Sequence, residues 1–166
     1  MSVTDRIDDA RILYSQGRRH GSLLSVLIAV TATARKRFPP NTPSRTDPSK
    51  PMGDIEAFST FLHDELGRMN VPVDRPLQFR GRSTTFEMLL YRFVRNELAP
   101  KAEQAFEVQF HPATGDAVEI DVIDDQLILS DNILDRLGRT VTQSPENQSL
   151  FTRPSQPAGA FRMPGR

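Results

Sequence analysis

The protein has 166 residues, of which 37% are hydrophobic and 25% are charged, and its 21 basic residues balance its 21 acidic residues. This length and composition predict a single globular domain and exclude a chain that is disordered throughout. A formal charge of zero excludes a polybasic protein that holds nucleic acid by bulk charge, and the absence of cysteine excludes disulfides and thiolate metal sites.

The first 100 residues are predicted to be mainly helical, because apolar residues recur there at the three- and four-residue spacing of amphipathic helices. The second helix is apolar on most of its faces between Leu23 and Val30, so it is expected to be the central buried helix. A proline-rich window over residues 39–53 is expected to be a surface loop. The predicted helices cover residues 4–16, 19–37, 54–69 and 84–98.

The helix predicted over residues 84–98 has two distinct faces. Thr84 and Glu87 have the spacing of a capping box at its start. Apolar residues from Phe86 to Val94 recur with helical spacing and form the expected core face. The other face is aromatic and basic and carries Met88, Tyr91, Arg92 and Arg95.

The pattern changes after Pro100, where apolar residues begin to alternate. Strands are predicted over residues 105–111, 117–123 and 126–130, the first two pairing as an antiparallel β-hairpin. A last helix is predicted over residues 131–143. The fold class is therefore mainly α, with a small antiparallel β-hairpin appendage and a C-terminal helix. A single domain is expected over residues 1–147, followed by a disordered tail over residues 148–166.

The charged residues are unevenly distributed along the chain. Residues 1–101 carry 16 basic and 11 acidic residues, whereas residues 102–166 carry 5 basic and 10 acidic residues. An acidic β part and a basic helical part are therefore expected to attract each other, within one protein or between copies.

Signals for a membrane, a metal and a cofactor are absent. The first nine residues carry three aspartates instead of a secretory signal, and no apolar stretch approaches the about 20 residues of a membrane span. The three histidines do not pair at ligand spacing, Asp124 and Asp125 suit a turn better than a metal site, and no Gly-rich phosphate loop is present. We expect a cytoplasmic protein with no metal, no cofactor and no membrane association.

The most informative group of polar residues lies on the helix predicted over residues 84–98. Arg92 and Arg95 are one turn apart, with Tyr91 and Asn96 beside them. A guanidinium group binds a phosphodiester through two parallel hydrogen bonds and keeps its charge at any relevant pH. This favours contacts with RNA, but a solvated helix face or a face that packs on a second protomer would look the same.

The segment from Leu90 to Leu98 resembles the motif helix of HEPN proteins, which are helical ribonuclease-type domains of bacterial defence and toxin–antitoxin systems. Their signature is an arginine, usually followed by a polar residue, and a histidine four to six residues further on. Residues 10–38 and the segments 129–131 and 145–147 are similar as well, so that the resemblance spans about residues 5–148. It implies a helical bundle, catalytic roles for Arg95 and Asn96, and a homodimer with Met88, Tyr91, Arg92 and Arg95 at its two-fold interface.

The histidine of the motif is missing, because Pro100, Lys101 and Ala102 stand at the positions that the signature allows. Proline cannot transfer a proton, and the lysine is a poor substitute unless its pKa is strongly lowered. The resemblance therefore implies a protein of a bacterial or phage defence or counter-defence system that binds RNA or a protein partner from the same locus without efficient cleavage. The expected binding residues are Tyr91, Arg92 and Lys101.

Two other functions stay open at this stage. One is a metal-independent endoribonuclease in which another group replaces the missing histidine. The other is a structural or interaction subunit. The remaining histidines favour neither, because His63 lies beside an apolar helix stripe and is expected at the surface or boundary, and His111 precedes a proline in a predicted turn.

Overall fold

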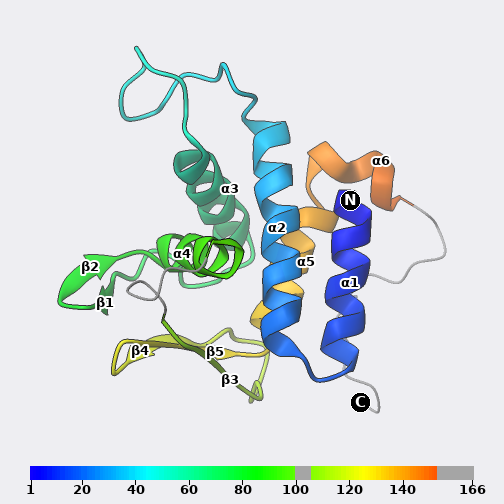
Figure 1. Ribbon diagram of the computed structural model, residues 1–166, viewed down its shortest axis with the longest axis vertical. Coiled ribbons are helices and arrows are strands. Elements are labelled where there is room, and N and C mark those ends of the chain that lie inside the picture. Colours follow the sequence, from blue (N-terminus) through cyan, green and yellow to red (C-terminus); the bar gives the residue numbers. More distant parts are fainter. Residues whose placement is uncertain (100–105, 153–166) are drawn as a thin grey trace.

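The computed structural model describes residues 1–99 and 106–152, and within these ranges the protein is mainly helical, as the sequence predicts (Figure 1). No helix of the described residues is long and apolar enough to cross a membrane. The helices are α1 (Val3–Ser15), α2 (Arg19–Arg37), α3 (Asp54–Arg68), α4 (Phe86–Leu98), α5 (Ile133–Thr142) and α6 (Gln148–Phe151), with a 3₁₀ turn η1 (Pro145–Asn147) before α6.

Helix α2 is the centre of the bundle, as its all-round apolar sequence predicts. It packs against α1, α3, α4 and α5, and Figure 1 shows α1 running beside it in the opposite direction. Because neighbours cover it on several sides, residues on nearly opposite sides of the helix, such as Leu27 and Ala29, are both fully buried. The prediction of a central buried helix is confirmed.

The starts of two helices differ from the predictions. Helix α1 begins one residue earlier than predicted, with Ser2 as its cap, and the Ser2 hydroxyl accepts a hydrogen bond from the backbone N–H of Asp5. Helix α4 is capped by Thr85, whose hydroxyl accepts from the backbone N–H of Met88 at 3.2 Å. The cap predicted at Thr84 is wrong, because Thr84 pairs with Leu77 in a strand.

A short hairpin, in a segment for which no helix or strand is predicted, precedes α4. Strands β1 (Leu77–Phe79) and β2 (Arg82–Thr84) pair in antiparallel register, with Arg80 and Gly81 as the two turn residues. Both turn residues have positive φ, 49° and 74°, which is the backbone of a tight type I′ turn. With only three residues in each strand, the alternating pattern is too short to stand out in the sequence.

The second sheet contains the three predicted strands in a different order. Strands β3 (Val108–His111), β4 (Ile120–Ile123) and β5 (Gln126–Ser130) are arranged β3–β5–β4, with β3 parallel and β4 antiparallel to β5. The predicted hairpin between residues 105–111 and 117–123 is therefore wrong.

Side-chain hydrogen bonds explain this strand order. The Asn132 side chain donates to backbone carbonyls of residues 115–117, and Asp131 accepts from the backbone N–H of Ala113, so this segment is held as a crossing loop. The hairpin is instead formed by β4 and β5 around Asp124 and Asp125, which have φ values of 51° and 57°.

Two segments predicted to be a loop and a tail contain regular structure. Pro43 and Pro51 form an isolated bridge, and Met52 in the same loop is 2% exposed. Helix α6 continues past the predicted domain end at residue 147 to Phe151. The rest of the predicted tail, residues 153–166, lies outside the described residues.

Candidate functional site

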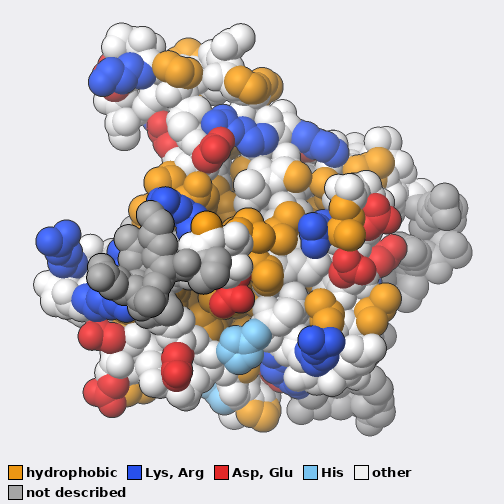
Figure 2. Space-filling model, in the orientation of Figure 1, with side chains coloured by type: hydrophobic (Ala, Val, Ile, Leu, Met, Phe, Trp, Pro, Cys, Tyr) orange, Lys and Arg blue, Asp and Glu red, His pale blue; other side chains and the backbone are white. Residues whose placement is uncertain are grey.

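Four exposed arginines gather where the β1–β2 hairpin meets α4. Arg80 and Arg82 come from the hairpin, and Arg92 and Arg95 come from α4. We call these four residues the arginine surface, and Figure 2 shows basic side chains over the hairpin. Among the described residues, no carboxylate forms an ion pair with Arg82, Arg92 or Arg95. Within residues 1–99 and 106–152, these three guanidinium groups therefore have no carboxylate that competes with an anionic ligand.

A buried aromatic ring holds two of these arginines in place. Phe79 is 5% exposed, and the guanidinium carbons of Arg80 and Arg92 lie 4.9 and 5.2 Å from the centre of its ring. Both distances fit cation–π contacts, which restrict the long arginine side chains. Phe106 packs edge-on against the same ring at 5.2 Å. The arginine surface is therefore partly ordered before any ligand binds.

The residues predicted from the sequence are only partly brought together. Arg92 and Arg95 are exposed on α4, and Met88 is 38% exposed. Tyr91 is half-buried, with its ring 5.2 Å from that of Phe58, so much of its surface is used inside the bundle. Asn96 is half-buried, and Lys101 lies outside the described residues.

The acidic sheet lies next to the basic hairpin within the same chain. Arg75 bonds to the backbone carbonyl of Ile120 and lies 3.8 Å from the carboxylate of Asp121. The backbone N–H of Arg80 donates to the carboxylate of Asp125 at 2.8 Å. The chain therefore places a segment with basic side chains next to the acidic sheet, although these contacts come from residues before and within the β1–β2 hairpin and not from the helices.

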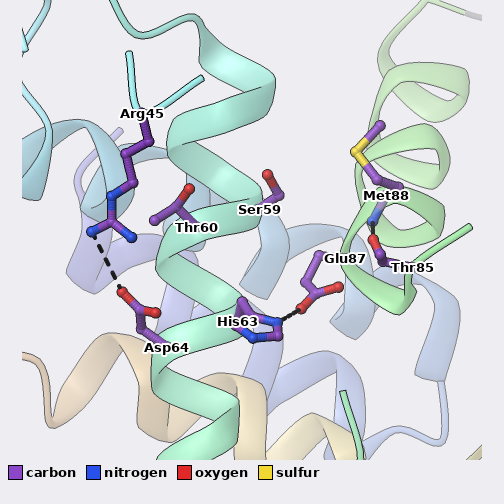
Figure 3. Close-up of a pocket in the computed structure, with 8 residues that line it drawn as sticks. All are labelled: Arg45, Ser59, Thr60, His63, Asp64, Thr85, Glu87 and Met88. Carbon is purple, nitrogen blue, oxygen red and sulfur yellow. Dashed lines mark hydrogen bonds and ion pairs between the residues drawn. The ribbon is translucent and has the colours of Figure 1, made fainter. Parts of the chain in front are cut away.

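A second group of polar residues lines a cavity of about 370 Å³ between α3 and the start of α4 (Figure 3). At its base, the His63 Nδ1 atom lies 2.8 Å from the Glu87 carboxylate, which is 2% exposed. The His63 Nε2 atom lies 3.3 Å from the exposed Asp74. The His63 ring therefore lies between a buried carboxylate on one nitrogen and an exposed carboxylate on the other. An imidazole oriented by a buried carboxylate can take part in proton transfer once a ligand replaces the exposed partner.

The position of Glu87 explains how a carboxylate is tolerated in the interior. Glu87 is in the first turn of α4, where unpaired backbone N–H groups make the helix end partly positive. Helices α3 and α4 pack against each other and bring Glu87 beside His63, 24 residues earlier. His63 is half-exposed, as expected for a residue at the surface or boundary of α3, but the capping role predicted for Glu87 gives no sign that the two side chains pair.

The other residues of this cavity supply no prepared nucleophile. The Ser59 hydroxyl, one turn before His63, donates to the backbone carbonyl of Ile55 at 2.8 Å, which holds it against its own helix. Arg45 lies across the cavity, 4.0 Å from Asp64. The arrangement can therefore move a proton to or from a bound hydroxyl or water, but it does not resemble a serine hydrolase triad.

The loop that carries Arg45 is attached to α3. The backbone N–H of Arg45 donates to Glu56 at 2.7 Å. A hydrogen bond with the Ser44 side chain and this backbone bond lower the pKa of Glu56 below its usual value. This anchor keeps Arg45 over the cavity wall.

Comparison with protein-family models, with curated proteins and with solved structures finds no match to this chain. Within residues 1–99 and 106–152, no three histidine or acidic side chains are grouped closely enough to hold a metal ion. The candidate sites therefore depend on the chain's own geometry.

Proposed function

We propose that this protein binds single-stranded RNA through the arginine surface and does not cleave it efficiently. The observation that carries the proposal is a set of three exposed arginines, Arg82, Arg92 and Arg95, that form no ion pair with a carboxylate of the described residues. Arg92 also contacts the ring of Phe79. A guanidinium group can donate two parallel hydrogen bonds to two oxygens of one phosphate. Exposed arginines are therefore typical contacts to the phosphate backbone of a nucleic acid. The resemblance of residues 90–98 to the HEPN motif helix supports RNA as the ligand and a bacterial or phage defence system as the setting.

The distances along α4 support binding without efficient cleavage. Metal-free RNA cleavage needs a proton-transfer group beside the phosphate-binding arginine. Glu87, which holds His63, precedes Arg95 by eight residues, or about 12 Å along the helix axis at 1.5 Å per residue. His63 is therefore not beside Arg95 in the way that the histidine of the motif would be.

The proposal is tested by fluorescence anisotropy with a labelled single-stranded RNA at several salt concentrations. Arg92→Gln and Arg95→Gln are each expected to weaken binding and to reduce its salt dependence, because each removes one phosphate contact. Arg18→Gln is the matched control, because Arg18 is exposed at the turn between α1 and α2 and, among the described residues, has no ion-pair partner. Wild-type protein that does not bind RNA would refute the proposal and favour a structural subunit or a protein partner from the same locus.

A metal-independent endoribonuclease is the second candidate, and the pair of His63 and Glu87 favours it. Met88 lines both the cavity of this pair and the cavity beside Arg92, so that the two cavities are neighbours on α4. An RNA strand that crosses Met88 would reach both. This candidate predicts cleavage in EDTA that His63→Gln and Arg95→Ala both abolish, whereas intact RNA after prolonged incubation refutes it.

A homodimer through the exposed face of α4 is part of the proposal. Of the four residues predicted for this interface, Met88 retains an exposed apolar side chain, and Arg92 and Arg95 are exposed beside it. Two copies related by a two-fold axis would align their arginine surfaces, which would lengthen the path available to RNA.

A further inference from the structure

A second feature of the arginine surface is a cavity of about 360 Å³ between the β1–β2 hairpin and α4. Its volume is at the small end of the about 300–1,000 Å³ typical of small-molecule sites. The hairpin contributes Phe79, Arg80, Arg82 and Ser83, and α4 closes the other side. A cavity this small suits a single nucleotide and not a run of several bases.

The walls of this cavity differ in chemistry. Arg82 and Arg92 line it from opposite elements, and neither forms an ion pair with a carboxylate of the described residues. The Ser83 hydroxyl is exposed beside them, while Met88 and Leu89 supply an apolar wall. A ligand that fits would present several anionic oxygens to one wall and an uncharged surface to the other.

A terminal phosphate meets this description better than an internal one. A phosphodiester carries one negative charge, whereas a phosphomonoester carries about −1.5 to −2 at neutral pH and has three oxygens that accept hydrogen bonds. Two guanidinium groups and a hydroxyl supply enough donors for all three oxygens. The apolar wall can cover one face of the adjoining sugar or base, and Arg95, one turn beyond Arg92, can contact the next phosphate.

We propose that the cavity between the β1–β2 hairpin and α4 binds the phosphorylated end of an RNA strand, with Arg82 and Arg92 holding the terminal phosphomonoester. This inference rests on the proposed function, because it assigns a part of the RNA to a part of the arginine surface. Arg95 then contributes to affinity for any RNA, whereas Arg82 and Arg92 discriminate between phosphorylated and unphosphorylated ends.

The test compares three labelled single-stranded RNAs of one sequence by anisotropy: one with a 5′-phosphate, one with a 3′-phosphate and one with two hydroxyl ends. One phosphorylated RNA is expected to bind about fivefold tighter than the unphosphorylated RNA, as charge-assisted hydrogen bonds at an exposed site allow. Arg82→Gln and Arg92→Gln should abolish this preference, while Arg95→Gln weakens binding of all three RNAs and preserves it. Arg18→Gln should change neither quantity, and circular dichroism melts check that each variant is folded.

The outcomes separate this inference from the proposed function. Equal affinities for the three RNAs, with Arg95→Gln still weakening all of them, overturn the terminal-phosphate site and leave RNA binding supported. A preference that survives both Arg82→Gln and Arg92→Gln also overturns it, because the phosphate would then be held elsewhere. A free nucleoside monophosphate that removes the preference in competition supports the cavity as the binding site. No binding of any of the RNAs refutes the proposed function itself.

Discussion

Replacing Asn147 by alanine is expected to destabilise the protein strongly, because this side chain connects the end of the chain to the central helix. Asn147 is fully buried in the turn η1. Its amide donates to the Thr33 hydroxyl at 2.9 Å and to the Val141 carbonyl at 3.1 Å, and its oxygen accepts from the Lys36 ammonium at 2.8 Å.

The magnitude follows from these three bonds. The two neutral hydrogen bonds contribute about 1 kcal/mol each, and the bond from the charged Lys36 contributes about 1.5–3 kcal/mol. Lys36 is exposed and can turn toward water in the variant, whereas the Val141 carbonyl loses a buried partner. We therefore expect Asn147→Ala to lower the free energy of unfolding by about 3 kcal/mol, a large part of the about 5–15 kcal/mol of a typical domain.

Urea unfolding followed by circular dichroism at pH 7 measures this loss. Asn41→Ala is the matched control, because Asn41 is exposed in the loop after α2, and it should change stability by less than about 0.5 kcal/mol. A loss below about 1 kcal/mol for Asn147→Ala would refute the reasoning, because it would mean that the three bonds add almost nothing over hydration in the unfolded chain.

Three further predictions concern acid stability, the histidine–glutamate pair and the oligomeric state. Hydrogen bonds from the Arg37 guanidinium lower the pKa of Glu146, so its stabilising effect is present above its unfolded pKa of about 4.3 and is lost as the pH falls through the lower folded pKa. The urea midpoint of Glu146→Gln should therefore fall less between pH 6 and pH 3 than that of the wild type, and parallel curves would contradict this. His63→Ala should lower the free energy of unfolding by about 2 kcal/mol, because it leaves the Glu87 carboxylate buried without its partner. Adding Glu87→Met should recover most of this loss in urea unfolding, and no recovery would show that the pair is not coupled. Met88→Glu should convert a homodimer into a monomer in size-exclusion chromatography with light scattering, and a monomeric wild type or an unchanged dimer would contradict the proposed interface.

The helices could be predicted from the sequence because their signals are local. The bounds of α2 match the prediction at both ends, since its first and last residues are set by nearby charges and by the prolines after Phe38. Gly17, two residues after the end of α1, has a φ of 74°, the left-handed backbone that glycine readily adopts at the end of a helix. Strands β3, β4 and β5 could be located for the same reason, because their two-residue alternation is visible in a few consecutive positions, whereas the three-residue strands β1 and β2 are too short for it.

The partners of the strands and of the site residues could not be predicted in this way. The arginines at positions 92 and 95 stand out in the sequence, but nothing near them shows that Arg82 lies across a shared cavity. The pair of His63 and Glu87 was missed because its members are 24 residues apart and each has an ordinary local explanation. Only the packing of α3 on α4 brings them together.

The sequence by itself therefore determined the main helices, the three longer strands, the central position of α2 and the exposure of Arg92 and Arg95, because backbone preference and helical period depend on neighbouring residues. The tertiary structure alone decided that β5 lies between β3 and β4, and that Tyr91 turns partly inward. Both features depend on contacts between residues that are far apart in the sequence. The free energies of those contacts depend on how well the packed surfaces fit each other, and no short segment contains that information.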